Sequence, residues 1–479
     1  MSFALAIGFV AFGCGGKNSA DDSDGGVTDD SRLPDDVPCV PDSLRCNGNE
    51  AQKCNEEGTG FETIETCSTF CAEGVCALDG LDVTTDQAMD GVVVVAGAVT
   101  IHSAATLSSP TGNLTIFADD LVVELGGAIT VAPTGASPLG KGFDGACTNC
   151  TTGGGSYGTT GPQGGTRYGS LTDSTVEPGA EGGRVFQTTT VATAKGGGVL
   201  RLIIKNKATI AGQLTANGGG GGADPTLCRF GGGGGSGGGI LVVADDLTVS
   251  GSISTAGGLG GVGVSGCGVG GIGGDGRVKL LFGAKNNITG TIIGAKTQGL
   301  APPLPVKSQS HPDPDKIYND GFLSFDVGWK KAFPSAMGYF VRIDQVANQP
   351  PTAADGTFLA QETVSFSPND IFDGENFVHL VTLDSQSAVG TVETVVKVQI
   401  NTQGPSMTSA SHPSQTTFSN NTNPLFAWSF PQGDMNVTGT HYILDNFGLT
   451  VPTTADTALP ATSPGCVVYA DRTLYLAQT

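Results

Sequence analysis

The stretch Gly239–Ala256, GILVVADDLTVSGSISTA, decides the fold class, because β-branched residues run into an Asp-Asp pair and then alternate with Ser and Thr. Related stretches begin at Asn113, Val199 and Arg277, and the last three copies follow one another at about 40 residues. A period of two predicts β-strands, and no window shows the helical period of crossover helices. We therefore predict an all-β protein in which residues 81–299 form a parallel β-helix or β-solenoid. A β-sandwich is the alternative for this region.

Glycine provides 76 of the 479 residues and is concentrated between the strand-forming stretches. The main glycine runs are 218–222, 231–235 and 257–274. Because glycine suits tight backbone turns and brings no side chain to a core, we expect these runs to leave the stacked strands as exposed loops.

Two pairs of carboxylates recur at one position of the repeat, Asp119-Asp120 and Asp245-Asp246. Aspartate commonly forms turns, so we interpret both pairs as turn residues and predict no catalytic residues and no enzyme. The alternative is a carbohydrate-active β-helix enzyme. Polysaccharide lyases with a parallel β-helix resemble this chain in architecture only, and they would require these aspartates to line one groove with basic residues beside them.

Two short matches to GGxGxD end at Asp224 and Asp275. They resemble half of a calcium-binding loop from tandem nonapeptide repeats, where each ion is shared between successive turns. The two matches are isolated, so we predict no metal site and no cofactor. Asp224 and Asp275 are kept as the calcium candidates.

The first residues, 1–13, are almost wholly apolar and lead into Ala11-Phe12-Gly13-Cys14. This stretch resembles the lipobox of bacterial lipoproteins. The resemblance implies that residues 1–13 are a signal peptide, that Cys14 carries lipid, and that the protein is exported to the outer membrane or cell surface by this lipid anchor. A short ordinary signal peptide is the alternative. Residues 14–38 are acidic and poor in apolar side chains, which predicts a flexible tether.

Residues 39–78 contain six closely spaced cysteines, which predict a disulfide-rich module in an oxidising compartment. Fifteen pairings are possible for Cys39, Cys46, Cys54, Cys67, Cys71 and Cys76. The stretch Cys46–Phe61 resembles small cysteine-rich modules of myxobacterial surface proteins. Further disulfide candidates lie in the glycine-rich region, namely Cys228 with Cys267, one repeat apart, and the pair Cys147 and Cys150.

The last part of the chain contains two related segments, 306–403 and 407–479. Ser310-His311-Pro312 recurs as Ser411-His412-Pro413, 101 residues later. Short alternating strands in units of this size resemble the fibronectin type III and immunoglobulin-like repeats of bacterial surface proteins, which implies β-sandwiches. The second repeat lacks its last strand, so we expect the natural chain to continue or another element to cover the open edge.

The formal net charge of -22, with only 23 Lys and Arg, excludes a surface positive enough to bind nucleic acid. The leading hypothesis is a non-enzymatic, multi-module cell-surface lipoprotein for adhesion, matrix or partner binding. Its expected ligand is a polysaccharide or a surface protein, and its expected contact with the membrane is the lipid on Cys14.

Overall fold

The computed structural model describes residues 41–145, 152–185, 193–223, 231–263, 268–304 and 325–400, with 306–308, 310–311 and 313–318 between the last two. Beyond residue 400 it describes the backbone of six strands. One 3-10 helix, η2 (Pro368–Asp370), occurs among these residues, and the rest are strands, turns and extended segments. The protein is essentially all-β, as predicted.

The central part, which we call the parallel body, consists of strands β6 to β19 in two parallel sheets. The eight-stranded sheet has the order β19-β17-β15-β13-β11-β9-β6, and β8 also pairs with β11. Its strands are β6 (Leu81–Val83), β8 (Gly91–Val94), β9 (Ala98–Ile101), β11 (Asn113–Val123), β13 (Val199–Ile210), β15 (Gly239–Val249), β17 (Arg277–Ile288) and β19 (Ala295–Leu300). The six-stranded sheet contains β7 (Gln87–Ala88), β10 (Thr106–Ser109), β12 (Ala128–Val131), β14 (Gln213–Thr215), β16 (Ser252–Ser254) and β18 (Thr291–Ile293).

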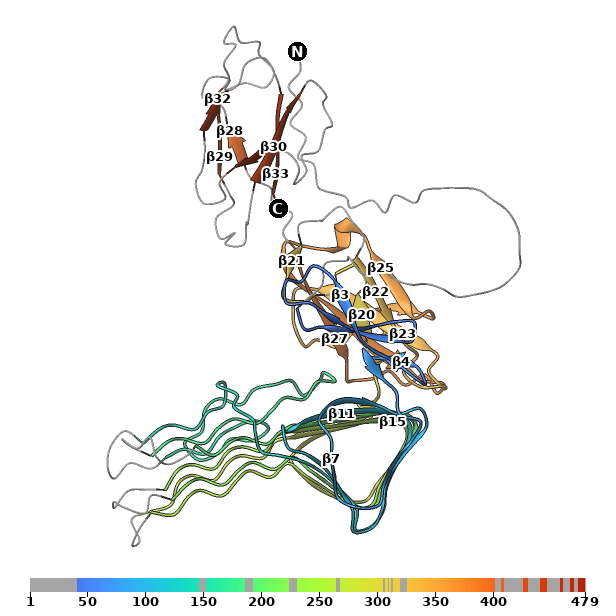
Figure 1. Ribbon diagram of the computed structural model, residues 1–479, viewed down its shortest axis with the longest axis vertical. Coiled ribbons are helices and arrows are strands. Elements are labelled where there is room, and N and C mark those ends of the chain that lie inside the picture. Colours follow the sequence, from blue (N-terminus) through green and yellow to red (C-terminus); the bar gives the residue numbers. More distant parts are fainter. Residues whose placement is uncertain are drawn as a thin grey trace, which may run out of the picture.

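Each repeat unit gives one long strand to the first sheet and one short strand to the second, and the next unit pairs with both in parallel register. Leu121 pairs with Ala208, which pairs with Leu247, and all three are fully buried. The corresponding residue of the last long strand is Asn286, which is exposed and ends this column of core residues. Viewed end-on, the body is a triangular ring around its core (Figure 1).

Glycine-rich segments connect β12 to β13, β14 to β15 and β16 to β17, and they extend away from the ring (Figure 1). We call these segments the glycine arms. Segment 231–238 shows how they pack. Every third N–H group along it donates to the same neighbouring segment. The N–H groups of residues 232, 235 and 238 donate to segment 216–222, those of 233 and 236 to 180–183, and those of 234 and 237 to 271–274. Three residues per turn, with hydrogen bonds only to neighbours, is the geometry of a polyproline II helix. The glycine arms therefore form a bundle of such helices held together through their backbones.

Close approach explains why these segments are glycine. A Cβ atom added to Gly233 would overlap the carbonyl oxygen of Gly153, and one added to Gly234 would overlap that of Gly258. All residues of 231–240 are buried. The glycine runs leave the stacked strands as predicted. The expectation that they are exposed loops is wrong for residues 231–235, because partners distant in the sequence cover them, whereas Gly220 is exposed and its neighbours in 218–222 are half-buried.

Alanine substitutions in the glycine arms test this packing. We expect Gly233→Ala to destabilise the protein by about 1–3 kcal/mol, because the added methyl group must displace backbone. The matched control is Gly220→Ala, where the nearest heavy atom to an added Cβ is 3.7 Å away. Its effect should stay within about 0.5 kcal/mol. Denaturant midpoints measure both changes, and equal midpoints for the two variants would contradict the bundle.

Residues 306–400 form two sheets that share an apolar core, and we call them the two-sheet module. All strand pairs in these sheets are antiparallel except β21 with β27. One sheet has the order β20-β22-β25 and the other β21-β27-β26-β23-β24. Phe325, Val378 and Leu380 are fully buried between them. The strands are β20 (Val306–Ser308), β21 (Ile317–Tyr318), β22 (Phe325–Trp329), β23 (Gly338–Asp344), β24 (Thr357–Leu359), β25 (Thr363–Phe366), β26 (Gly374–Leu383) and β27 (Thr394–Ile400).

The second C-terminal repeat has the same strand pairings as the first. Its sheets have the orders β28-β29-β32 and β31-β30-β33, which match β20-β22-β25 and β24-β23-β26. The strands are β28 (Ser406–Thr408), β29 (Leu425–Ser429), β30 (Thr440–Asp445), β31 (Thr457–Leu459), β32 (Cys466–Val468) and β33 (Thr473–Gln478). The repeated sequence therefore corresponds to a repeated backbone topology.

The two-sheet module shares a second apolar core with the parallel body. Leu241 and Leu281 on the outer face of the long strands pack in one buried cluster with Phe333 and Val392 of the module. Hydrogen bonds reinforce this junction: Thr382 Oγ1 donates to the Ala301 carbonyl at 2.7 Å. The body and the module therefore meet through a continuous core. Separating them would expose these apolar side chains to water, which is unfavourable.

The junction predicts cooperative unfolding. Phe333 is 2% exposed, and Phe333→Ala should weaken the junction by about 3–5 kcal/mol. We expect calorimetry to show one joint transition for the body and the module in the parent protein and a separate, earlier transition of the module in the variant. Phe358→Ala removes the same atoms from an exposed position of the same module and should leave the joint transition intact. An unchanged calorimetric profile for Phe333→Ala would contradict the shared core.

Candidate functional site

The disulfide-rich module begins the described chain with a three-stranded sheet, β1 (Leu44–Asn47), β2 (Glu50–Cys54) and β3 (Phe61–Thr66). A small hairpin follows, β4 (Cys71–Ala72) and β5 (Val75–Cys76). Disulfides join Cys46 to Cys71 and Cys67 to Cys76, and Cys54 is also disulfide-bonded. Such bonds stabilise a segment that is too short to bury a large core.

Several predicted site residues lie outside the described residues. They are the lipidation candidate Cys14, the module cysteine Cys39, the calcium candidate Asp224, and the loop cysteines Cys147, Cys150, Cys228 and Cys267. His412 also lies outside the described residues, and Cys466 is described only as part of the backbone of β32.

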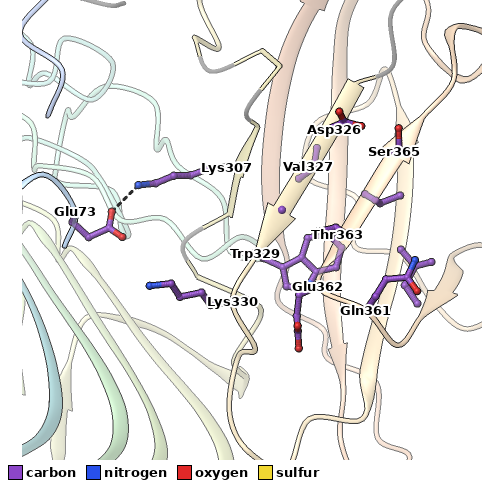
Figure 2. A pocket seen from close by; sticks show the side chains of 13 residues that line it. Glu73, Lys307, Asp326, Val327, Trp329, Lys330, Gln361, Glu362, Thr363 and Ser365 are labelled. Atoms are coloured by element: carbon purple, nitrogen blue, oxygen red, sulfur yellow. Dashed lines mark hydrogen bonds and ion pairs between the residues drawn. The ribbon is translucent and has the colours of Figure 1, made fainter. Parts of the chain in front are cut away.

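An open pocket of about 1150 Å³ lies on the two-sheet module, and the disulfide-rich module contributes Glu73 to its lining. Its floor is the outer face of β22 and β25, where Asp326, Thr363 and Ser365 are exposed because strand side chains alternate between core and solvent. Figure 2 shows Glu73 of the disulfide-rich module facing the pocket from the opposite side. The pocket thus depends on two modules that are far apart in the sequence.

Charges of both signs line this pocket. Glu73 Oε2 lies 2.9 Å from Lys307 Nζ and forms an ion pair that links the two modules. Lys330 lies beside this pair (Figure 2) and makes no ion pair with any described residue. Glu362 and Gln361 extend the polar lining along the loop before β25. The pocket therefore offers an ammonium group that has no ion-pair partner in the described part of the chain, together with carboxylate, amide and hydroxyl groups.

Sequence reasoning did not find this pocket. Glu73 and Lys307 are 234 residues apart and belong to no common motif. The one available signal was Trp329-Lys330-Lys331, which places two lysines next to a tryptophan in a chain with few basic residues.

The recurrent aspartates lie at a bend inside the long strands and not at turns between strands. The pairing register shifts at Asp120 in β11 and at Asp246 in β15, as in a β-bulge. Asp120 Oδ1 accepts a hydrogen bond from Lys207 N at 3.2 Å, and Asp245 Oδ1 accepts one from Ala284 N at 2.9 Å. The interpretation as turn residues is therefore corrected: the aspartates lie within the long strands, and Asp120 and Asp245 bind backbone N–H groups of the next unit.

Lysines alternate with these aspartates along the bend. In the strand register, Asp120 lies next to Lys207, Lys207 next to Asp246, and Asp246 next to Lys285 on successive strands. Asp119 Oδ1 also lies 3.3 Å from Lys205 Nζ. The four aspartates do share one register and do have basic neighbours, but they stand on an outer bend of the strands and their charges alternate with lysine charges.

The remaining candidates have structural contacts. Asp275 Oδ1 accepts a hydrogen bond from Gly257 N at 3.2 Å, which ties two glycine arms together. His311 is buried and packs its ring against Tyr318 and Phe325 in the two-sheet module. Among the described residues no group of three or more His, Cys, Asp or Glu side chains is arranged to hold a metal ion.

Comparisons with known proteins add no family. No family model matches the chain, and no curated protein matches it. The described part of the chain also contains no helix long and apolar enough to cross a membrane. The candidate site must therefore be interpreted from its own geometry.

Proposed function

We propose that this protein is a non-enzymatic, multi-module cell-surface lipoprotein that binds a polysaccharide. In this proposal the parallel body is a β-solenoid, residues 306–403 and 407–479 are immunoglobulin-like sandwiches, and the lipid on Cys14 holds the chain at the outer membrane. The observation that carries the proposal is the pocket between the disulfide-rich module and the two-sheet module, whose lining carries charges of both signs, with Lys330 unpaired among the described residues.

The lining of the pocket suits a polysaccharide that carries carboxylates. Lys330 would pair with a sugar carboxylate, while the oxygens of Asp326, Thr363 and Ser365 would accept or share hydrogen bonds with sugar hydroxyls. A volume of about 1150 Å³ accommodates several sugar units of an extended chain. The side chains on the pocket floor are short strand residues, so the site is held in place by the sheet beneath it.

The rigid attachment of the modules supports a role in display. The apolar junction around Phe333 fixes the two-sheet module on the parallel body, and a partly exposed ion pair between Glu73 and Lys307 also joins the two-sheet module to the disulfide-rich module. Binding by a surface that is already ordered avoids part of the entropic cost of association. The proposal needs no reaction, since Asp119, Asp120 and Asp245 already bind backbone and lysine groups.

Charge reversal in the pocket tests polysaccharide binding. We expect Lys330→Glu to weaken binding to alginate, an acidic polysaccharide, about tenfold or more, because a charge-assisted hydrogen bond contributes about 1.5–3 kcal/mol. Affinity electrophoresis of the full chain in gels that contain alginate or neutral dextran measures the effect. Lys331→Glu, the same change at the adjacent exposed residue outside the lining, should bind as the parent does. Equal retardation of both variants by alginate would contradict the site.

Membrane fractionation tests the anchor. We expect the full chain, expressed in a lipoprotein-competent bacterium, to appear in the membrane fraction with an acylated Cys14 that mass spectrometry detects. Cys14→Ser should move the protein to the soluble exported fraction, since the thiol that carries the lipid is lost. Surface protease on intact cells then reports display. An unmodified, soluble parent chain would contradict the lipoprotein assignment and leave the pocket as the site of a secreted protein.

A further inference from the structure

A lysine with a buried side chain lies under the segment that joins the parallel body to the two-sheet module. Lys279, on β17, has a side chain that is 1% exposed. Segment 168–178, which we call the strap, covers it and also contacts the module: Glu393 N donates to the Thr172 carbonyl at 2.7 Å. Burial of a lysine ammonium is costly, so the groups around it must compensate for the lost water.

Those groups come from the strap. Lys279 Nζ lies 2.6 Å from Asp173 Oδ1 and 2.7 Å from the Asp173 carbonyl. Two donors of Thr175, its N–H at 2.9 Å and its hydroxyl at 3.0 Å, point at the same carboxyl oxygen. An amine thus lies against a carboxyl group whose Oδ1 is already held by two further hydrogen-bond donors, as an oxyanion would be.

The surroundings favour the reactive forms of these groups. Burial lowers the pKa of Lys279, which favours the neutral amine with its free electron pair. The amine of Lys279 and the carboxyl group of Asp173 therefore lie together, and solvent has almost no access to the amine.

We propose that Lys279 and Asp173 form an intramolecular amide bond. A proton passes from the Lys279 ammonium to the Asp173 carboxylate, and the neutral Nζ then attacks Cγ. The resulting oxyanion at Oδ1 is held by the two donors of Thr175. The nitrogen gives its surplus proton to the departing hydroxyl, which leaves as water. One C–O bond breaks, one C–N bond forms, and nothing is oxidised or reduced. Fixed proximity supplies the high effective concentration that the reaction needs.

The bond would fasten the junction covalently. The strap bonds to the two-sheet module through Ser174, whose hydroxyl lies 3.2 Å from the Thr394 hydroxyl, while Lys279 belongs to the last long strand of the body. A cross-link between residues 106 positions apart would therefore hold the strap, the body and the module together. The cross-link is independent of the polysaccharide site, which lies at β22, β25 and the disulfide-rich module.

Peptide mass spectrometry of the full chain after unfolding, reduction and trypsin digestion tests the proposal. We expect Tyr168–Arg184 to be joined to Val278–Lys285, with a mass one water below the sum of the two peptides and no cleavage after Lys279. The exposed pair Lys53 and Asp42 has the same separation of 2.6 Å and should remain unlinked in the same digest. Recovery of free Tyr168–Arg184 and of Leu280–Lys285 as the only products would overturn the proposal.

Two variants separate the chemistry from simple burial. Thr175→Val should leave the fold intact by circular dichroism but reduce the cross-link, because one of the two donors that hold the oxyanion is lost. Asp173→Asn should still cross-link, with the loss of one ammonia in place of one water. An undiminished cross-link in Thr175→Val would overturn the role assigned to Thr175, and a cross-link that still forms in Lys279→Arg would overturn the assignment of the lysine.

Discussion

Backbone hydrogen bonding between successive repeat units in parallel register is the interaction on which the rest of the structure depends. It places Leu121, Ala208 and Leu247 in one buried column and so produces the core of the parallel body. It also places the exits of the glycine arms one above another, which lets each arm reach the next. The flat outer face of the same strands then supplies Leu241 and Leu281 to the junction with the two-sheet module.

The glycine arms show how a chain with few aromatic side chains can still bury much of its backbone. Their stability comes from hydrogen bonds and from close approach, and both require that no side chain intervenes, as at Gly233. Each bond contributes only about 0.5–1.5 kcal/mol net, so the arms depend on many bonds forming together. This packing explains why glycine is so abundant without making this region flexible.

The sequence allowed prediction of the all-β class, the repeat period and the common register of the Asp-Asp pairs, because each depends on residues close together in the chain. It did not reveal that the pairs occupy bulges, since a bulge is defined by the partner strand. The order of the glycine arms was also missed, because Gly155 bonds to Gly234 and Gly234 to Gly271. The pocket around Lys330 and the buried pair of Lys279 and Asp173 likewise depend on segments brought together by the fold.

The central claim is that the described chain is a rigid scaffold whose glycine arms are as ordered as its strands. Native-state hydrogen exchange of the full chain measures this most directly, because each glycine carries an amide that reports its own hydrogen bond. The structure predicts that amides 232–238 exchange as slowly as those of β13 and β15. Exchange of these amides at the rate of an unfolded chain, with the strands still protected, would contradict the account.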